Sequence, residues 1–299
     1  MKLLKYSTIA IIFTLSINTF AQLSSSDFSF ILSADTRHFA GPEYQSPEYF
    51  LGICTAINSI GPGSFMISSG DIDPPWNIYS DLTDALGKNY PWYPVVGNHE
   101  AETEEDMVWL RKYYFNHLEG KVNKGPANCE ETTYSFDYND AHFAIINQYY
   151  DGESDKELDG DVSEALFNWL KSDLESSDKK FKFVIGHEPI VSLPDYDNGR
   201  HRHKADNLDK YPENSFKFQK LLRENNVTAY VCGHTHNFSI AKLNGIWQID
   251  PGHARGKGDA GAASTFIKMN LKNNKWELLV YRSDETFQKY SLWHTFEID

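Results

Sequence analysis

Five short apolar runs, each followed at once by a small polar cluster, leave this 299-residue chain few ways to fold. Apolar runs of four to eight residues are typical of buried β-strands. The five runs and the clusters that follow them are Phe28–Ala34 with Asp35, Phe65–Ser69 with Gly70-Asp71, Trp92–Val96 with Gly97-Asn98-His99-Glu100, Phe181–Ile185 with Gly186-His187, and Ala229–Cys232 with Gly233-His234-Thr235-His236. The sequence therefore predicts five strands with polar side chains at one end of each.

Segments with helical periodicity lie between these strands. The predicted helices are Ser46–Ile60, Ile78–Leu86, Glu104–Leu118, Ser163–Ser176 and Glu213–Asn225. Strands that alternate with helices indicate an α/β protein. In open α/β sheets, ligands bind beyond the carboxyl ends of the strands, which is where the polar clusters lie.

Three hairpin signals interrupt this alternation: Asn139-Asp140, Asn244-Gly245 and Asn273-Asn274. Such pairs between strand-like runs are typical of tight β-turns. The runs that they join are Tyr134–Tyr138 and His142–Asn147, Ser239–Leu243 and Ile246–Ile249, and Thr265–Leu271 and Lys275–Tyr281. Antiparallel hairpins added to an α/β pattern predict a mixed core of two sheets with helices outside.

The first 21 residues have the order of a secretory signal peptide. Lys2 and Lys5 form a basic start, Ile9–Leu15 is apolar, and Ala21 is a small residue at the expected cleavage site. The apolar run falls short of the ~20 residues that span a bilayer. We therefore expect residues 1–21 to be a signal peptide and residues 22–299 to be one exported domain, periplasmic or extracellular.

The net charge argues against some classes of partner, and the cysteine content limits disulfide pairing and metal binding. The formal net charge of −14 disfavours general binding to nucleic acid or to anionic membranes. The three cysteines are an odd set, so at least one is unpaired or intermolecular. Their spacing fits no zinc motif, and a bridge between Cys54 and Cys129 stays open.

Each polar cluster has an ordinary explanation when it is taken alone. His234 and His236 can be a loop pair, and Asn98 can cap the helix that follows it. Five strand ends in order, each with a metal-ligand side chain, are not expected by chance. The side chains offer oxygen and imidazole nitrogen but no thiolate, which suits Mn, Fe or Zn in a reactive site rather than a structural zinc site.

These clusters resemble the motifs of the calcineurin-like metallophosphoesterase superfamily, and the resemblance runs through most of residues 22–299. Further motifs are similar to the purple-acid-phosphatase branch: Tyr134-Ser135-Phe136-Asp137, His142-Phe143, Trp169-Leu170 and Gly186-His187-Glu188-Pro189 up to Ser192. The resemblance implies a four-layer α/β/β/α fold. It also implies hydrolysis of phosphate esters by a hydroxide that bridges two metal ions.

The resemblance assigns a role to each cluster. Asp71 would bridge both metal ions, and His99 would face the leaving-group oxygen as a general acid or charge stabiliser. The remaining ligands would be Asn98, His187 and His234 at one ion, and Asp35 and His236 at the other.

Two positions depart from the family pattern. Many members have a His ligand where this chain has Arg37, and relatives often have a carboxylate or a metal-binding Tyr where it has Pro74. Arg stays protonated and is a poor metal ligand, so one metal site lacks a usual partner. We expect Arg37 to contact the substrate phosphate, with a salt bridge as an equal alternative. Asp73 is a candidate substitute for the missing carboxylate.

Two further stretches are candidates for the substrate pocket. Gly199–Lys204 is a basic island in an acidic protein, and His201, Arg202 and His203 are its predicted substrate-binding residues. Pro251–Gly258 is rich in glycine, and a solvated flexible loop is the favoured interpretation there.

The sequence thus predicts an exported phosphoesterase with two metal ions and a small phosphorylated substrate, either a mono- or a diester. A phosphodiesterase for cyclic nucleotides or glycerophosphodiesters is the alternative among enzymes. A metal- or phosphate-binding protein without catalysis is the alternative from another class, favoured by Arg37 and Pro74. Substrate identity, metal identity and oligomeric state stay open.

Overall fold

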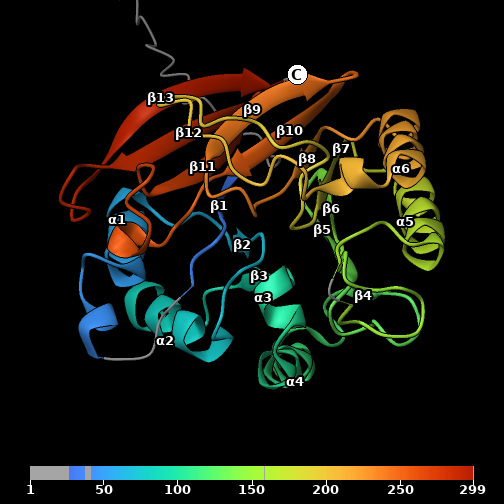
Figure 1. Ribbon diagram of the computed structural model, residues 1–299, viewed down its shortest axis with the longest axis horizontal. Coiled ribbons are helices and arrows are strands. Elements are labelled where there is room, and N and C mark those ends of the chain that lie inside the picture. The colour runs from blue at the N-terminus through green and yellow to red at the C-terminus, as the bar shows by residue number, and fades with distance from the viewer. Residues whose placement is uncertain (1–26, 38–41, 158, 299) are drawn as a thin grey trace, which may run out of the picture.

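Two mixed β-sheets face each other with helices on their outer sides, as the alternating strands and hairpins predict (Figure 1). The computed structural model describes residues 27–37, 42–157 and 159–298. The predicted signal peptide lies outside the described residues. Among the described residues, no helix has both the length and the apolar character needed to cross a membrane.

The first sheet has six strands in the order β13-β12-β11-β1-β2-β3. Strands β1, β2 and β3 run parallel, and the C-terminal strands β11 to β13 add antiparallel neighbours to β1. The bounds are β1 (Phe28–Ser33), β2 (Met66–Ser68), β3 (Trp92–Pro94), β11 (Thr265–Lys272), β12 (Lys275–Ser283) and β13 (Tyr290–Ile298).

The second sheet has seven strands in the order β4-β5-β6-β7-β8-β10-β9. Its central strands β6, β7, β8 and β10 are parallel, and the predicted hairpins β5–β6 and β9–β10 extend it on both sides. The bounds are β4 (Asn123–Lys124), β5 (Tyr134–Tyr138), β6 (Ala141–Ile145), β7 (Phe181–Ile185), β8 (Ala229–Val231), β9 (Phe238–Leu243) and β10 (Ile246–Pro251).

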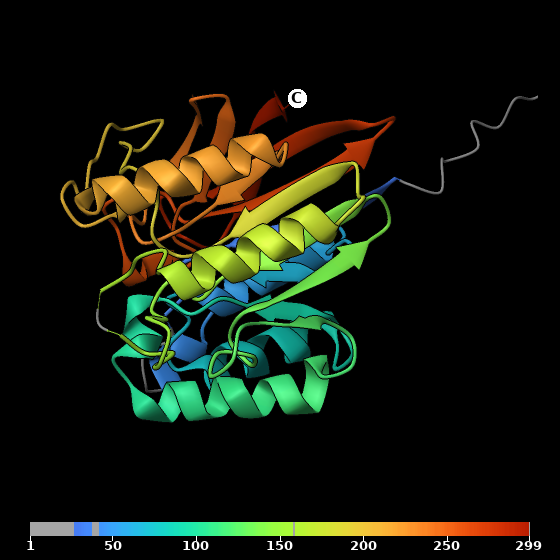
Figure 2. The ribbon, with the colours of Figure 1, turned by 90° about the vertical axis from the view of Figure 1, so that its right-hand side faces the viewer.

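Helices cover the outer face of each sheet, which gives four layers. Helices α5 and α6 lie over the seven-stranded sheet, as Figure 2 shows, and α1 and α2 pack together beside the six-stranded one. The helix bounds are α1 (Phe50–Ile60), α2 (Pro75–Leu86), α3 (Asn98–Ala101), α4 (Glu104–Tyr113), α5 (Glu164–Ser176) and α6 (Pro212–Glu224).

Helix α5 shows how the sequence sets these elements. The Ser163 side chain accepts a hydrogen bond from the Leu166 N–H at 3.3 Å and caps the helix. Leu166, Leu170 and Leu174 follow at intervals of four residues, so they lie on one face and are fully buried against the sheet. Helix position and helix face therefore both follow from local sequence.

Aromatic rings fill the space between the two sheets. Phe30 of β1 and Phe65, which precedes β2, contact Phe143 of β6 edge to face, with ring centroids 5.2 and 5.3 Å apart. Fully burying each such ring stabilises the fold by about 1.5–3 kcal/mol. Because rings from both sheets interlock, the sheets are held at a fixed spacing, and so are the loops at their ends.

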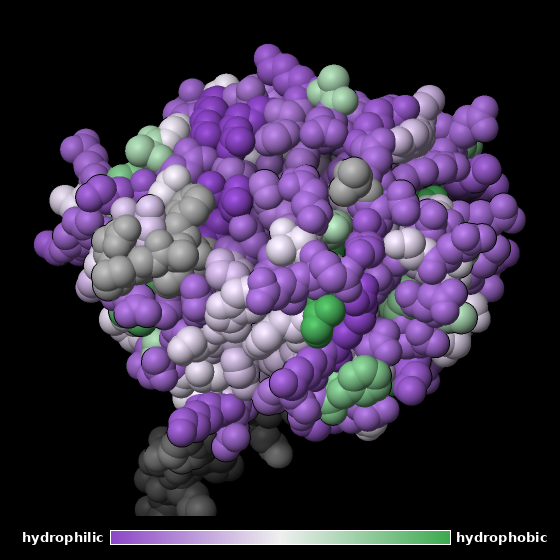
Figure 3. Space-filling view, turned by 60° about the horizontal axis from the view of Figure 1, so that its bottom comes forward, coloured by the Kyte–Doolittle hydropathy of each residue, from purple (hydrophilic) through white to green (hydrophobic). Residues whose placement is uncertain are grey.

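The predicted strands and helices end within a few residues of the observed ones, apart from one helix. The helix expected over Glu104–Leu118 changes at Tyr114 into a π-helical turn, Tyr114–Leu118. The Cys54–Cys129 bridge is not formed, because Cys54, Cys129 and Cys232 are all free and buried. Figure 3 shows a face that is hydrophilic apart from isolated hydrophobic residues, in keeping with the net charge of −14.

Candidate metal centre

The predicted ligand residues lie in loops at the carboxyl ends of strands in both sheets. Asp35 follows β1, Asp71 follows β2, and Asn98 begins the short helix α3 after β3. His187 follows β7 of the other sheet, and His234 and His236 follow β8. Because α3 begins at Asn98, this residue starts a one-turn helix of its own and does not cap α4. Ligand-type side chains from strands far apart in sequence are therefore presented at the same end of the sandwich.

The backbone at four of these positions has a conformation that side chains rarely adopt. Asp35, Asp71, His234 and His236 have φ angles of 49°, 52°, 69° and 58°. Left-handed backbone at a residue other than glycine costs on the order of 1–2 kcal/mol. Such strain is concentrated at functional sites, where the surrounding structure maintains it.

Glycines let these loops approach one another closely. A Cβ atom at Gly97 would lie 2.3 Å from the backbone nitrogen of Asp71, and one at Gly70 would lie 2.4 Å from Nδ1 of His187. Both distances are shorter than van der Waals contact allows. Glycine at both positions therefore allows the backbone to approach closely in a crowded site.

Asp71 lies at the middle of the cluster. Its Oδ1 is 3.3 Å from Nε2 of His187, and its Oδ2 is 3.6 Å from Nε2 of His99. One ligand atom from each of Asp35, Asp71 and His187 lies within 4.8 Å of the other two. The central place that the resemblance gives to Asp71 agrees with this geometry.

Hydrogen bonds on the far side of the ligands fix their orientation. Nδ1 of His187 donates to the carbonyl oxygen of Ser69 at 2.7 Å, so Nε2 has its lone pair free on the side of Asp71. At the other histidine, Nε2 of His236 lies 3.5 Å from Oδ1 of Asp35. Each imidazole thus turns one nitrogen toward a ligand carboxylate.

Glu100 joins two of the ligand loops and was given no role in the sequence analysis. Its buried carboxylate accepts the backbone N–H groups of Asp71 at 3.0 Å, Ile72 at 2.7 Å and Gly97 at 2.7 Å. Burial raises the pKa of Glu100, the charges of Asp71 and Asp73 act in the same direction, and the N–H groups of Gly97 and Ile72 oppose them. The side chain therefore fixes the loop after β2 against the loop after β3.

Burial and mutual charge set the protonation of the ligands. Burial raises the pKa of Asp35, with the charge of Asp71 acting in the same direction. Burial would also raise the pKa of Asp71, but the neighbouring imidazoles, His187 first, lower it to about 2. Burial lowers the pKa of His234 and of His236 to about 3. Both rings are therefore neutral near pH 7 and have lone pairs available for a metal ion.

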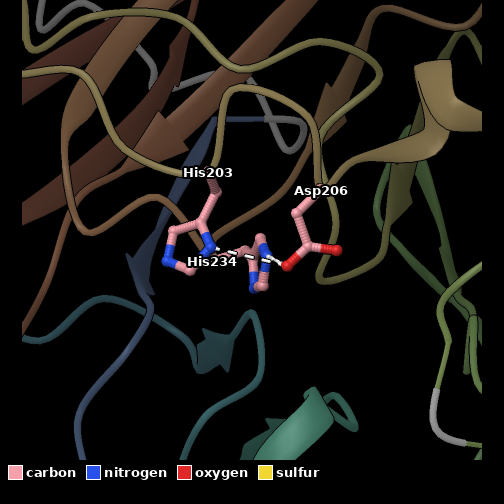
Figure 4. A group of neighbouring side chains, drawn as sticks. All are labelled: His203, Asp206 and His234. Carbon is pink, nitrogen blue, oxygen red and sulfur yellow. Dashed lines mark ion pairs between the residues drawn. The ribbon is translucent and has the colours of Figure 1, made fainter.

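Figure 4 shows a second group, in which His203 and Asp206 lie beside His234. Oδ2 of Asp206 is 3.5 Å from Nε2 of His234 and 3.6 Å from Nδ1 of His203. The two rings are 4.1 Å apart between centroids. His203, predicted to bind substrate, thus also lies within ligand distance of a metal bound at His234.

The unsatisfied atoms of the site fit metal ions. Within the described residues, several buried polar atoms of the site make no hydrogen bond, which is costly unless another partner binds them. These atoms are both carboxylate oxygens of Asp35, Oδ1 of Asn98, Nε2 of His187 and Nε2 of His234. Asn98 Nδ2 is 3.3 Å from Glu102, which fixes the amide with its oxygen as the free ligand atom. Carboxylate and amide oxygens with imidazole nitrogens suit Mn, Fe or Zn.

Arg37 contacts both Asp73 and His99. Its Nε is 2.9 Å from Oδ1 of Asp73, and its Nη1 is 2.9 Å from Nε2 of His99. The salt bridge that was the alternative for Arg37 is therefore formed. Because the same guanidinium also reaches His99, Asp73 is linked to the predicted leaving-group histidine through Arg37 rather than directly.

The basic island reaches the site with two of its three predicted residues. Arg202 contacts His236 and lies 3.3 Å from Asp259, and His203 lies beside His234. His201 is not brought to the ligands; its Nε2 contacts the carbonyl oxygen of Ser192 at 3.2 Å.

Asp206 and Asp259 were missed by the sequence analysis. Asp206 lies two residues after the basic island, and Asp259 follows Gly258, where the glycine-rich stretch was taken to end. Proximity to those stretches was the one available signal.

Two sheets between helices, with oxygen and imidazole side chains at their strand ends, fit the class of metal-dependent phosphoesterases. The model of the calcineurin-like phosphoesterases matches residues 41–238, and the chain belongs to that family. Its relatives further support the purple-acid-phosphatase branch. Tartrate-resistant acid phosphatase type 5 of Rattus norvegicus is 25% identical over 178 residues, which cover 56% of this chain and 50% of the relative.

A plant purple acid phosphatase is also similar to this chain, and its name describes it as probably inactive. Probable inactive purple acid phosphatase 9 of Arabidopsis thaliana is 26% identical over 211 residues, 60% of this chain and 30% of that protein. The chain spans about half the length of the first curated relatives it matches.

Solved structures share the fold at low sequence identity. PhoD superposes with a TM-score of 0.65 at 11% identity, covering 91% of this chain and 69% of PhoD. GAP50 of Plasmodium gives 0.54 at 18% identity, covering 92% of this chain and 89% of GAP50.

Proposed function

We propose that this chain is an exported phosphoesterase that hydrolyses phosphate mono- or diesters at a centre of two metal ions. The observation that carries this proposal is the convergence of six ligand-type side chains from loops of both sheets, four of which have buried polar atoms without a hydrogen-bond partner among the described residues. A protein that needed only a stable core would not retain several unsatisfied polar atoms in one place.

The residues divide between two ions around Asp71. Asn98, His187 and His234 would hold one ion, and Asp35 and His236 the other, with Asp71 shared by both. His203 and Asp206 are additional candidates beside His234. Two bound ions would supply Lewis acidity toward the phosphoryl oxygens and an activated water as nucleophile.

His99 and Arg37 complete the site on the side of Asp73. His99 is partly exposed and lies within 3.6 Å of Asp71, so a leaving group bound at the centre can reach its ring. Arg37 is about a quarter exposed and turns part of its guanidinium toward His99. A guanidinium there can bind phosphoryl oxygens while it orients the ring.

The direct test is metal analysis of the purified protein together with turnover of chromogenic phosphate mono- and diesters. We expect bound Mn, Zn or Fe, loss of turnover after chelation, and recovery when one of these metals is added back. His187→Ala should bind less metal and lose turnover, while Lys88→Ala, remote from the site, should retain both. A metal-loaded wild-type protein without turnover on either ester would refute the catalytic proposal.

Substrate preference is decided in the same panel. Faster turnover of diesters, cyclic nucleotides and glycerophosphodiesters among them, would identify a phosphodiesterase. Faster turnover of monoesters would identify a phosphatase. Arg202 and His203 at the rim are the side chains that would contact the part of the substrate beyond the phosphorus.

Export is proposed from the signal-peptide pattern of residues 1–21. Expression of the full chain in a bacterial host, followed by fractionation and mass spectrometry, should find the mature protein outside the cytoplasm and beginning at Gln22. Full-length protein retained in the cytoplasm would contradict this part of the proposal.

A phosphate- or metal-binding protein without catalysis is the second candidate, and one contact favours it. Arg37 Nη1 can only donate, so its hydrogen bond requires Nε2 of His99 to accept. In that arrangement the ring cannot give a proton from Nε2 to a leaving group. Tight phosphate binding by the metal-loaded protein, with no turnover, would support this candidate.

A further inference from the structure

Asp259 lies in the loop between β10 and β11 and reaches the side of His236 that faces away from Asp35. Oδ2 of Asp259 is 2.8 Å from Nδ1 of His236, while Nε2 of the same ring is 3.5 Å from Oδ1 of Asp35. The imidazole therefore lies between a predicted ligand carboxylate and a second carboxylate that belongs to none of the five strand-end clusters.

Other groups hold Asp259 in place and in its charged form. Nη2 of Arg200 donates to Oδ2 at 2.9 Å, and the backbone N–H of Gly261 donates to Oδ1 at 3.0 Å. Nη1 of Arg202 also lies 3.3 Å from Oδ2, so two guanidinium groups pair with this carboxylate. An ionised carboxylate accepts hydrogen bonds and donates none.

The contact with Asp259 bears on which nitrogen of His236 carries the hydrogen. A hydrogen bond from Nδ1 to this acceptor requires Nδ1 to be the N–H group, which leaves the lone pair on Nε2 toward Asp35. Arg202 Nη1 also makes a close contact with Nδ1, and a guanidinium only donates. Without Asp259, Arg202 would therefore favour the opposite tautomer, whose Nε2–H cannot bind a metal ion.

We propose that Asp259 is a positioning residue that holds His236 in the tautomer needed to bind a metal ion beside Asp35. The inference rests on the proposed metal centre and adds to it a residue outside the family motifs of this sequence. Carboxylates in this position orient a ligand imidazole and raise its basicity, and losing one weakens metal affinity by about 10- to 100-fold.

The test is a Zn²⁺ titration of the metal-free protein, followed by competition with a chelating dye. In Asp259→Asn we expect one zinc equivalent to bind about 10- to 100-fold more weakly than in the wild type and the other to be unchanged. Asp284→Asn is the matched control, because Asp284 caps an exposed turn through the N–H of Thr286 at 3.0 Å. Equal zinc affinity of Asp259→Asn and wild type at both equivalents would overturn the proposal.

A second measurement does not depend on the folding of any variant. In ¹⁵N NMR spectra of the metal-free wild type, we expect His236 to carry its hydrogen on Nδ1, and a hydrogen on Nε2 would overturn the proposal. Different results would refute the metal centre and the role of Asp259. A wild-type protein that binds no zinc would refute the metal centre itself. Zinc affinity that is the same in Asp259→Asn and the wild type would refute only the role of Asp259.

Discussion

Glu100 is the single residue on which the geometry of the ligand loops depends most directly. It accepts N–H groups from three backbone positions in two loops, and it is fully buried. A buried backbone N–H that loses its hydrogen-bond partner costs about 1–3 kcal/mol. The position of Asp71 is thus determined by a side chain that is not itself a predicted ligand.

Glu100→Gln tests this dependence. The amide has one oxygen instead of two and turns an NH₂ group toward a backbone N–H, so we expect the free energy of unfolding to fall by about 3 kcal/mol. Urea denaturation of the metal-free protein measures the loss. Glu105→Gln, at an exposed position in the first turn of α4, is the control and should unfold like the wild type. Equal stability of the two variants would show that the three hydrogen bonds contribute little.

Arg37 is the second residue with a specific expected effect. If its guanidinium binds the phosphoryl group, Arg37→Ala should weaken inhibition by inorganic phosphate about tenfold, the equivalent of ~1.4 kcal/mol, because a charge-assisted hydrogen bond is lost. Metal content should not change, since Arg37 is not a ligand. Arg223→Ala, in the last turn of α6, supplies the control. An unaltered inhibition constant would leave the salt bridge with Asp73 as the role of Arg37.

At the level of elements, His142 on β6 joins its sheet to helix α5. Its ring nitrogens lie 2.7 Å from Asp137 on β5 and 2.8 Å from Asp173 on α5. Burial lowers the pKa of His142, but hydrogen bonds to Asp173 and Asp137 outweigh burial and raise it above its ordinary value. The charged ring therefore stabilises the folded protein, and this contribution is lost as pH rises through the folded-state pKa.

His142→Gln should consequently be more destabilising near pH 6 than near pH 9. At the lower pH the variant loses a charged group between two carboxylates, at a cost of about 3 kcal/mol, whereas at the higher pH the wild-type ring is itself neutral. Urea unfolding at the two pH values measures the difference. Asp178→Asn, at an exposed charge in the turn after α5, should show no such dependence. An equal cost at both pH values would mean that His142 is neutral throughout.

How much could be predicted from the sequence depended on whether a feature is set by neighbouring residues or by residues far apart in the chain. The strand ends at Asp35, Asp71 and His187 were predictable, because apolar runs and the residues that end them are local features. Strand β13 was not predicted, since the six residues between β12 and β13 have no two-residue turn signal. Asp259 could not be assigned either, because its contact with Arg202 joins loops 57 residues apart. Contacts between loops become visible only when the fold is known.

On the scale of the whole molecule, the ligands come from both sheets. Asp35, Asp71 and Asn98 follow strands of the six-stranded sheet, and His187, His234 and His236 follow strands of the seven-stranded one. A metal ion bound between them would link the two halves of the sandwich, and it would bind only the folded chain. Metal should therefore stabilise the entire fold rather than one loop.

Removal of metal should lower the melting temperature of the whole protein in one transition. At a free metal concentration about 100 times Kd, binding adds about 2.7 kcal/mol, which corresponds to a shift of about 5–10 °C for a domain of this size. Calorimetry of the chelated and the metal-loaded protein measures this shift, with Ca²⁺ or Mg²⁺, which prefer all-oxygen sites, as the control ions. A melting temperature unaffected by Zn²⁺, Mn²⁺ or Fe would contradict a centre between the sheets.

The left-handed backbone at Asp35, Asp71, His234 and His236 has a consequence for the evolution and engineering of this fold. Glycine adopts that conformation without steric strain, and a substitution by glycine would also remove a buried charge or an unsatisfied ring nitrogen. A mutant library selected only for thermal robustness in the presence of chelator should therefore enrich glycine at these four codons. A library selected for phosphate release should contain no glycine at these positions. The residues found at the four positions would therefore distinguish selection for thermal stability from selection for catalytic activity.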